Sequence, residues 1–330
     1  MGIKVLHSGI QATIQDLGRY GMQKFGVIVG GAMDTISLRL ANLLVGNAQH
    51  EGALEITLFG TSLCFESDEV IAITGANLQP TIDGEKASMW RPLFVRKGSV
   101  LKFHAAISGC RAYVSFSGGI QVPMVMKSKS TYLRAGIGGF EGRNLQKNDL
   151  FVCGERSLFG EELLCRLQNE SSHVSWSVNY SAFVNFNKKK TIRMIRGSEY
   201  ERFDQSNIQK FLSMPYTISP YADRMGYRLI GEPIHLKEPF ELLSEGVTYG
   251  TVQVPSNGQP IILMADRQTT GGYPKIGQVI SADLPLLGQM QATDQVHFQE
   301  VTLEEAQLAL IEQEKMINMV KCSLRIKQHT

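Results

Sequence analysis

Short apolar runs that end at glycine, aspartate or asparagine recur along this chain and limit what it can fold into. Each run has the length and the turn-forming borders of a β-strand. Charged residues make up only 19% of the chain and glycines number 32, which favours many strands joined by tight turns over a helix-rich fold. The sequence therefore predicts a mainly β protein, with strands at 70–74, 93–96, 100–104, 112–116, 191–195 and 261–265.

Helical signals are few and the helices they predict are short. Three segments have a capping residue followed by helical spacing of apolar residues. They are 34–45, which Asp34 caps, a short helix that follows Ser198, and 303 to about 319, which follows Thr302. In the last two segments a glutamate, Glu201 or Glu305, lies three residues after the cap, which is the spacing of a capping box.

A polar segment rich in serine and asparagine, over 168–190, is the best candidate for a domain boundary. We place this boundary near residue 187. The sequence thus predicts an N-terminal β domain over 1–187 and a C-terminal β domain, ending in a helix, over 188–330.

Two sets of residues recur along the chain at a nearly constant offset, as internal duplications do. At an offset of 189, Asp34, Arg39 and Leu40 recur as Asp223, Arg228 and Leu229. At an offset of 190, Glu55, Gly60, Thr61 and Ile71 recur as Glu245, Gly250, Thr251 and Ile261. An ancient duplication accounts for both sets, and coincidence between two strand-rich segments is the alternative.

The composition excludes several classes of protein. With 33 basic and 31 acidic side chains, the net charge of +2 is too small to bind nucleic acid electrostatically. No apolar run approaches the roughly 18 residues that a membrane-spanning helix needs, so no membrane is expected as a partner. The five cysteines lack CxxC spacing and predict neither disulfides nor zinc, as in a reduced, cytoplasmic protein. No cluster of His, Asp and Glu predicts a metal site.

Several motifs of nucleotide, protease and biotin chemistry are also missing from the sequence. It contains no GxxxxGK[ST] phosphate-binding loop, no HExxH and no GxSxG. Met126-Lys127-Ser128 lacks the second methionine that flanks a biotinylated lysine, so no covalent biotin is expected.

Two polar stretches near the N-terminus allow a structural or a functional interpretation. In 13–21, two glycines permit a turn in which Asp16 and Arg19 either pair with each other or bind a ligand. Gly30-Gly31 leads to Asp34, where helix N–H groups could face an anion; a plain helix cap is the alternative.

Later stretches place cations and hydroxyls beside glycines. Residues 128–131 and 138–143 together suit a carboxylate or phosphoryl group, because Arg143 can bind two oxygens at once, although a turn with solvated cations fits equally. The segments 250–255 and 265–274 are the richest in polar residues. The second directly follows an apolar strand, as expected of a loop that presents side chains to a ligand.

These stretches together resemble the allophanate hydrolase subunit 2 family, also called the Kip inhibitor antagonist or biotin-dependent carboxyltransferase-like family, and within it the C subunits of 5-oxoprolinase. The matching stretches are TIQDLGRYG from Thr13, GGAMD from Gly30, AN-LVGN from Ala41, ALEITLFG from Ala53, Ser130-Thr131, GGFEGR from Gly138, DRMGYRL from Asp223, GTVQVP from Gly250 and DRQTTGGYP from Asp266. They appear in the family's order and span residues 13 to 274.

The resemblance implies two tandem cyclophilin-like β-barrel domains with a few short helices. It also implies two partner proteins, one Kip inhibitor-like and the other LamB/YcsF-like. Together these open a small lactam, 5-oxo-L-proline, to L-glutamate with ATP, which this chain would share with its partner. Phosphorylation of the lactam oxygen would make the ring carbon an electrophile for water.

This chemistry requires cations for the substrate carboxylate and the phosphoryl group, and polar groups that orient them. The resemblance and the chemistry assign Asp34, Asp266 and Arg224 to catalysis, and the two carboxylates are candidates for proton transfer. Arg224 also takes part in anion binding. The other residues assigned to binding of substrate and anions are Arg143, Arg228, Gln253, Gln268, Thr269, Ser130 and Lys129.

Two other functions agree with the resemblance. One is a non-catalytic antagonist that binds a Kip inhibitor-like protein; the other is a carboxyltransferase component of a biotin-dependent, urea carboxylase-like system. The sequence departs from the family at Lys127-Ser128-Lys129, where relatives usually have Gly-Ser-Arg, and a point charge thus replaces a forked guanidinium.

Overall fold

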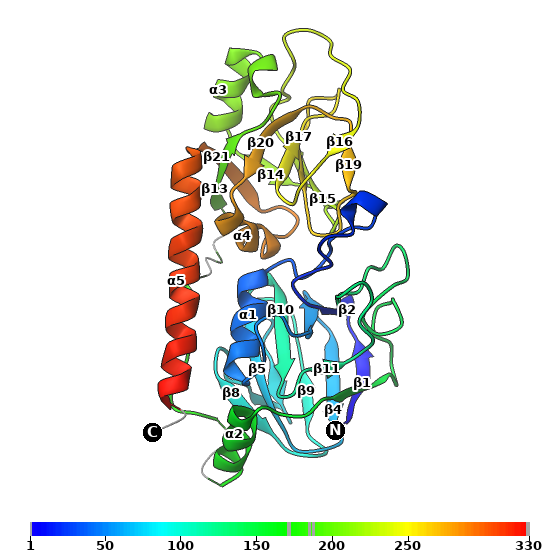
Figure 1. Cartoon of the computed structure of the whole chain (residues 1–330), viewed down its shortest axis with the longest axis vertical. Helices are drawn as coiled ribbons and strands as arrows, with labels where there is room; N and C mark the ends of the chain where they lie inside the picture. The colour runs from blue at the N-terminus through cyan, green and yellow to red at the C-terminus, as the bar shows by residue number, and fades with distance from the viewer. Residues whose placement is uncertain (1, 170–172, 184–185, 187–188, 328–330) are drawn as a thin grey trace. The chain divides into compact units, whose positions relative to one another are not determined.

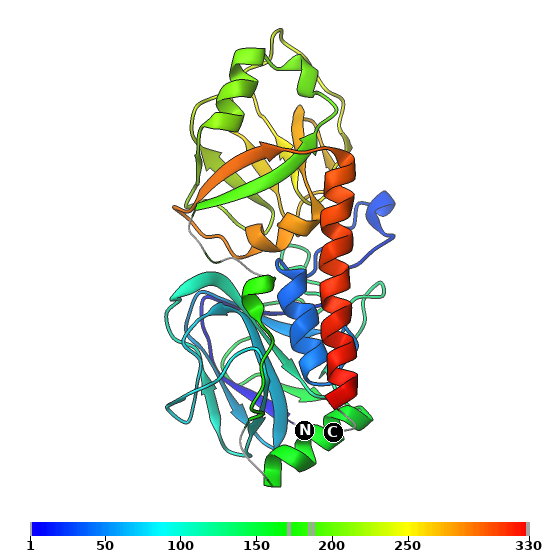
Figure 2. The same ribbon diagram turned by 90° about the vertical axis from the view of Figure 1, so that its left-hand side faces the viewer.

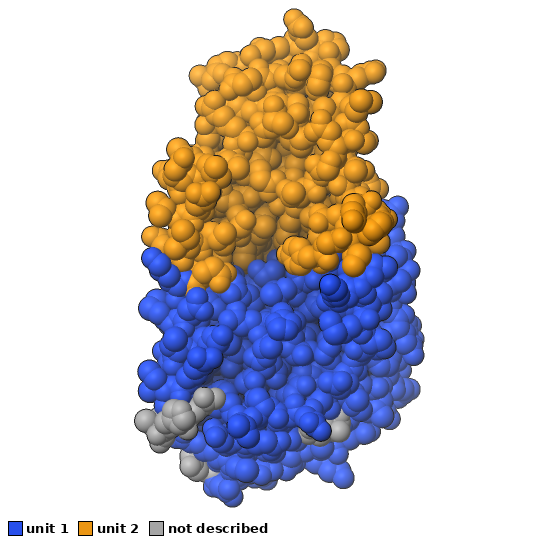
Figure 3. All heavy atoms as spheres, in the orientation of Figure 1, with its two compact units in different colours: residues 1–19, 30–186, 315–330 blue, residues 20–29, 187–314 orange. Residues whose placement is uncertain are grey.

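The computed structural model describes residues 2–169, 173–183, 186 and 189–327, and strands dominate it (Figure 1). The chain divides into two compact units. Unit 1 comprises residues 1–19, 30–186 and 315–330, and unit 2 comprises 20–29 and 187–314 (Figure 3). The sequence-based boundary at 187 differs from this division in two places, because 20–29 group with unit 2 and the C-terminal residues from 315 group with unit 1.

Unit 1 contains two antiparallel sheets whose facing apolar side chains form one core. The first, in spatial order, consists of β11 (Ile120–Gln121), β12 (Leu150–Cys153), β1 (Gly2–Ser8), β4 (Thr61–Phe65), β9 (Val100–Lys102), β6 (Thr81–Ile82) and β7 (Glu85–Lys86). The second consists of β2 (Gln11–Gln15), β3 (Ala53–Thr57), β10 (Ser108–Phe116), β5 (Glu69–Asn77) and β8 (Pro92–Val95).

Strand β5 shows how the layers follow from the alternation of side chains along a strand. Its residues Ile71 and Ile73 point into the core between the sheets. Val70 and Ala72 point to the opposite face and join a second apolar cluster. Because both faces are covered, β5 is an apolar run without polar alternation, which is why the sequence signals it so clearly.

Helices supply the second cluster of unit 1. They are α1 (Thr35–Leu44), α2 (Leu158–Asn169) and the C-terminal part of α5 (Leu303–Lys327). The 3-10 helix η2 (Tyr180–Ala182) follows α2 in the chain. Figures 1 and 2 both show α1 beside the red C-terminal half of α5. Ile317 and Leu324 of α5 are buried in this cluster together with Ile36 of α1.

Unit 2 is a closed seven-stranded barrel. Around it run β13 (Lys189–Arg196), β20 (Lys275–Val279), β17 (Thr251–Gln253), β18 (Ile261–Leu263), β15 (Gly226–Ile230), β14 (Tyr216–Ile218) and β21 (Gln295–Glu300). Strands β13 and β21 pair in parallel and close the barrel, whereas the other neighbours are antiparallel. Outside it lie α3 (Gln205–Ser213), α4 (Leu284–Gly288), the two-stranded ribbon of β16 (Glu245–Gly246) and β19 (Thr270–Gly271), and the turns η1 (Gln23–Phe25), η3 (Tyr200–Arg202) and η4 (Ser281–Asp283).

The mainly β fold predicted from the sequence is confirmed, and each of the six predicted strands overlaps an observed one. Strand pairing closes a barrel in unit 2, whereas the described strands of unit 1 form two stacked sheets. Not every helix is short, since α5 has 25 residues.

The predicted helix caps differ in their outcome. Asp34 caps α1 by accepting from the backbone N–H of Ser37 at 2.9 Å, as predicted. At the start of α5, the Thr302 N–H donates to Glu305 at 2.8 Å and the Glu305 N–H donates to the Thr302 hydroxyl at 3.2 Å. After Ser198 only the three-residue 3-10 helix η3 forms, with Glu199 rather than Ser198 at its N-cap position and no side-chain cap, and α3 begins later with Asp204 as its cap.

Of the two sets of recurring residues, one matches in structure and the other does not. Gly60 and Gly250 both adopt positive φ, 96° and 86°, and each introduces a strand, β4 or β17. Arg39, in contrast, lies in helix α1, whereas Arg228 lies in strand β15. The residues that recur at an offset of 190 therefore include a glycine turn that leads into a strand in both copies. The residues that recur at an offset of 189 lie in different kinds of secondary structure.

Candidate functional site

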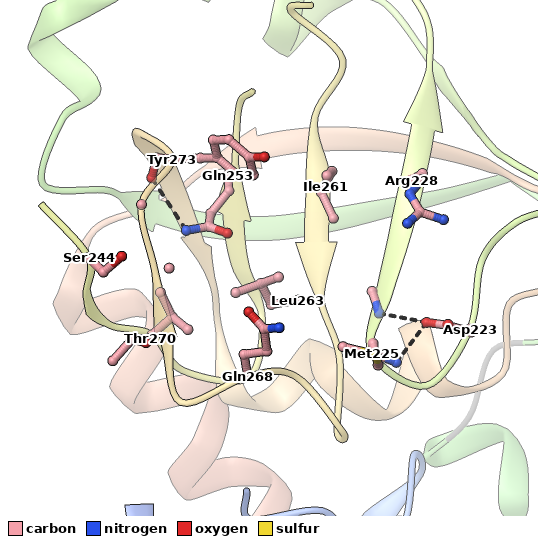
Figure 4. Close-up of a pocket in the computed structure, with 14 residues that line it drawn as sticks. Asp223, Met225, Arg228, Ser244, Gln253, Ile261, Leu263, Gln268, Thr270 and Tyr273 are labelled. Carbon is pink, nitrogen blue, oxygen red and sulfur yellow. Dashed lines mark hydrogen bonds between the residues drawn. The ribbon is translucent and has the colours of Figure 1, made fainter. Parts of the chain in front are cut away.

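A row of three side chains on the outer face of the barrel forms the floor of the candidate site. Gln253 of β17 pairs with Ile261 of β18, and Ile261 pairs with Arg228 of β15. Residues that pair directly across a sheet point to the same side. Their strand neighbours Val252 and Ile262 are fully buried, so the row points away from the barrel interior (Figure 4).

A cavity of about 520 Å³ lies over this row. The β16–β19 ribbon and the loop after β18 cover it, through Ser244, Thr270 and Tyr273 among others. Met225 and Leu263 add apolar surface. The cavity is therefore concave, partly apolar and lined by a few convergent polar groups, as small-molecule sites usually are.

Gln253 is the most enclosed polar side chain of the row, with 4% of its surface exposed. Its Nε2 donates to the backbone carbonyl of Tyr273 at 3.3 Å. Gly271 packs against this amide so closely that a Cβ there would clash with Nε2. The glycine of β19 thus makes room for the glutamine, and the ribbon covers it.

Among the described residues that line the cavity, Arg228 is the one with a cationic side chain. It is exposed, and its guanidinium donates to the Tyr221 carbonyl at 3.3 Å. Among the described residues, no carboxylate lies within ion-pair distance of it. Asp223 also lines the cavity, but its Oδ1 accepts from the backbone N–H groups of Met225 at 2.8 Å and Gly226 at 3.1 Å. The positive charge of Arg228 is available to an anionic ligand.

Arg224 and Asp266 form a buried ion pair beside the cavity, and neither lines it. Arg224 Nε and Asp266 Oδ2 are 2.8 Å apart, and Arg224 Nη2 and Asp266 Oδ1 are 2.9 Å apart. Each residue is only 6% exposed. The pair ties the turn before β15 to the start of the polar loop, and so holds the loop that presents Gln268, which does line the cavity.

Lys275 fixes the ribbon that covers the row. It pairs with Gln253 across the strands, and its Nζ lies 2.9 Å from Glu245 of β16 and 3.4 Å from Glu199. Burial alone would lower the pKa of Lys275, but the two carboxylates raise it above its ordinary value. Burial alone would raise the pKa of Glu199, but the Lys275 N–H and ammonium lower it.

The predicted site residues of unit 1 are all engaged in structural contacts. Lys129 Nζ lies 2.5 Å from Glu51, and the Ser130 hydroxyl donates to Asp16 Oδ1, also at 2.5 Å. Arg19 donates to the carbonyl of Ser130 at 2.7 Å. Asp16 and Arg19 therefore hold the distant 128–130 segment, rather than locking only their own turn.

Arg143 and Asp34 also have close partners. Arg143 lies 2.6 Å from both Asp149 and Glu141, and the hydrogen bond to Asp149 is the largest of the effects that raise its pKa above its ordinary value. Asp34 caps α1, with its second oxygen accepting from the Ser37 hydroxyl at 2.6 Å. Their assignment to anion binding and catalysis stays a prediction.

The structure thus brings three of the predicted residues, Arg228, Gln253 and Gln268, to one cavity, and places Thr269 and the Arg224–Asp266 pair next to its lining in sequence. Sequence reasoning missed Ile261 as a member of this site, and it included Tyr273 only as part of the loop 265–274. A signal for Ile261 existed in the polar residues that flank the predicted strand, but its partners depend on strand register, which one sequence does not show.

The described part of the chain offers no group of three or more His, Cys, Asp and Glu side chains placed to hold a metal ion. In the same residues, no helix is both long and apolar enough to cross a bilayer.

A known domain family matches most of the chain. The family described as carboxyltransferase domain, subdomain A and B, matches residues 25–300. This chain belongs to the carboxyltransferase domain family. The resemblance found in the sequence is thereby confirmed.

Named relatives within the carboxyltransferase family agree with this membership. The C subunit of the Haemophilus influenzae 5-oxoprolinase is 40% identical over 304 residues, covering 92% of this chain and 93% of that protein. The C subunit of the Escherichia coli K12 5-oxoprolinase is 39% identical over 314 residues, covering 95% and 96%. The crystal structure of the Kluyveromyces lactis urea amidolyase superposes with a TM-score of 0.87 at 28% identity, covering 96% of this chain but 20% of that one.

Proposed function

We propose that this chain is the C subunit of a 5-oxoprolinase and acts only within a complex with two partners, one Kip inhibitor-like and one LamB/YcsF-like. The observation that carries the proposal is identity of about 40% to two such C subunits over more than nine-tenths of each chain. Because each alignment covers more than nine-tenths of the relative, the comparison concerns nearly all of that C subunit rather than one module of it.

The proposed reaction opens a lactam with ATP. One water molecule adds to the ring carbonyl carbon, the C–N bond breaks, and the nitrogen takes up a proton to become the amine of L-glutamate. A second water molecule is consumed as ATP becomes ADP and phosphate. The balance is therefore 5-oxo-L-proline, ATP and two water molecules to L-glutamate, ADP and phosphate.

The cavity of unit 2 suits the lactam better than the nucleotide. Of the described lining residues, Arg228 is the single cation and Asp223 the single carboxylate, and the others are neutral polar or apolar. One guanidinium matches one carboxylate, whereas a triphosphate requires several cations or backbone N–H groups. We therefore assign the lactam acid to this cavity and derive no step through ATP from it.

The test is ATP-dependent formation of glutamate from 5-oxo-L-proline by this chain with its cognate Kip inhibitor-like and LamB/YcsF-like partners, each omitted in turn. The proposal expects glutamate only from the complete mixture. Arg228→Ala should reduce turnover at low substrate concentration by at least about tenfold, because the carboxylate loses its charged partner. Lys210→Ala is the matched control, since Lys210 is an exposed cation of α3 outside the cavity. No glutamate from the complete mixture would refute the proposal.

A carboxyltransferase role is the second candidate, favoured by the TM-score of 0.87 to the urea amidolyase structure. It requires a biotinylated partner, and it expects transfer of a carboxyl group from carboxybiotin in a mixture that forms no glutamate. A stable complex with the Kip inhibitor-like partner that carries out neither reaction would instead favour the non-catalytic antagonist.

A further inference from the structure

Gln253 carries a hydrogen-bond acceptor that nothing in the described chain uses. Its Nε2 donates to Tyr273, but its Oε1 accepts from no group among those residues. Some polar atoms of the described chain are fully enclosed and lack a hydrogen-bond partner, but Oε1 of Gln253 is not one of them. This oxygen is therefore accessible, and it faces the cavity that Gln253 lines. In Figure 4 it points away from Tyr273, toward the middle of the cavity. A residue only 4% exposed thus presents one carbonyl oxygen to a ligand.

The orientation of this amide follows from chemistry. The Tyr273 backbone carbonyl can only accept a hydrogen bond, so the NH2 group of Gln253 must face it. Gly271 lies against the same side of the amide and limits its movement. The cavity side of Gln253 is therefore an acceptor, which selects ligands that carry a donor.

Arg228 stands at the other end of the same row. Neighbouring strands lie about 4.8 Å apart, so two strand spacings separate the Cα atoms of Gln253 and Arg228 by roughly 10 Å. Both side chains are long and rise from the same face of the sheet. Their polar ends can meet a small ligand from two sides, one with an acceptor and one with a cation.

Apolar side chains fill the space between these two groups. Ile261 lies in the row itself, and Leu263 follows it on the same face of β18. A ligand seated here therefore places carbon atoms over the strand, a donor toward Gln253 and an anionic group toward Arg228.

We propose that this row recognises an N–H lactam that carries a carboxylate next to its nitrogen: Gln253 Oε1 accepts the ring N–H, Arg228 binds the carboxylate, and Ile261 and Leu263 contact the ring methylenes. This inference rests on the proposed function and adds how the substrate is selected. It makes Gln253 a specificity-determining residue for the lactam nitrogen, and it excludes rings that present an oxygen or a methyl group there.

Analogues of the ligand test the role of Gln253 without any mutation. The lactone 5-oxotetrahydrofuran-2-carboxylate replaces the N–H by oxygen, and N-methyl-5-oxoproline replaces it by a methyl group. Either would leave a buried acceptor facing no donor, and such mismatches cost an enzyme large factors in discrimination. The expected result is inhibition of glutamate formation at least about 100-fold weaker than competition by a second N–H lactam acid.

Variants of the full chain complete the test in the reconstituted complex. Gln253→Met keeps the length of the side chain and removes the acceptor, so discrimination between lactam and lactone should fall to within about tenfold. Gln209→Met, on the exposed face of α3, is the matched control and should keep wild-type discrimination. Thermal unfolding of each variant checks folding. Unchanged discrimination in a folded Gln253→Met chain, or equal binding of lactam and lactone by the wild type, would overturn the inference.

The two proposals can fail separately. If the wild-type complex forms glutamate but binds the lactone as well as the N–H lactam, the proposed function stands and the inference is wrong. If no glutamate forms, calorimetric titration of the full chain with 5-oxo-L-proline and with the lactone decides the inference alone. Binding of the lactam only would support it, and binding of neither would overturn it.

Discussion

At the scale of single residues, the Arg224–Asp266 pair separates stability from ligand binding. Both side chains are 6% exposed, and removal of Arg224 leaves the Asp266 carboxylate buried without this ion pair. We expect Arg224→Ala to lower the free energy of unfolding by about 3–5 kcal/mol, measured by urea titration with circular dichroism. Arg228 is exposed on β15, so Arg228→Ala should change the free energy of unfolding by less than about 0.5 kcal/mol. Equal unfolding midpoints for both variants would contradict this assignment.

Lys275 gives the stability of unit 2 a defined dependence on pH. Its pKa is raised in the folded chain, so its contribution is complete below the unfolded value of about 10.4 and is lost as pH rises through the folded value. The pKa of Glu199 is lowered, so its contribution is present above about pH 4.3 and is lost as pH falls through its folded value.

Unfolding midpoints between about pH 9 and about pH 11 test the alkaline side of this dependence. Lys275→Met should lose less stability over that range than the wild type, because the variant has no ammonium there to discharge. Lys210→Met, at an exposed cation, should follow the wild type. Parallel curves for all three proteins would show that Lys275 contributes nothing to the pH dependence.

The residue types of the site could be predicted from the sequence, but their arrangement could not. Gln268 stands out because it follows a predicted apolar strand, whereas Gln253 belongs to the polar segment 250–255 and Arg228 to the repeat and the family resemblance. The link between Arg228 and Gln253 is Ile261, an ordinary strand residue whose importance comes from pairing with both. Arg224 and Asp266 lie 42 residues apart, so local spacing gives no sign that they pair.

At the scale of elements, α5 stabilises unit 1 through its C-terminal half. Ile317 is fully buried in the apolar cluster with α1 and α2, whereas Met319 is 60% exposed. We expect Ile317→Ala to destabilise the chain by about 2–5 kcal/mol through lost burial and a cavity. Met319→Ala should cost less than about 0.5 kcal/mol. Hydrogen exchange should show the loss of protection in α1; faster exchange confined to unit 2 would contradict this packing.

The first turn of α5 depends on the reciprocal bonds of Thr302 and Glu305. Thr302→Ala removes the hydroxyl that accepts from the Glu305 N–H, which typically costs about 1 kcal/mol. Thr302→Ser keeps the hydroxyl and should restore most of that stability. A fall in helix content or unfolding midpoint that is the same for both variants would rule out capping as the cause.

Elements with local signals were predictable, and those that need distant partners were not. Asp34 and Thr302 act on residues three positions away, so the sequence predicts both caps. Helix α2 was missed, although the Ser157 hydroxyl accepts from the Gly160 N–H at 3.2 Å near its start. A glycine in its first turn weakens the helical pattern, and burial of Leu163 in the apolar cluster with α1 and α5 compensates for it.

At the scale of the whole molecule, the division into units does not follow chain order, which no local pattern shows. A fragment over 1–187 contains every described strand of unit 1 but lacks the helix residues from 315. We expect this fragment to expose the apolar cluster that Ile317 and Leu324 normally cover, to bind a hydrophobic dye, and to unfold at lower temperature than unit 1 does in the full chain. A fragment with the dye binding and thermal stability of the full chain would contradict the role of α5.

The late position of these helix residues also constrains how the protein is made in the cell. All described strands of unit 1 have been synthesised by residue 153, yet the residues that complete its apolar cluster follow more than 160 positions later. Since domains generally fold as they leave the ribosome, unit 1 must wait with an uncovered apolar surface while the barrel is translated. We expect a nascent chain stalled before residue 315 to recruit chaperones, and to release them once α5 has emerged.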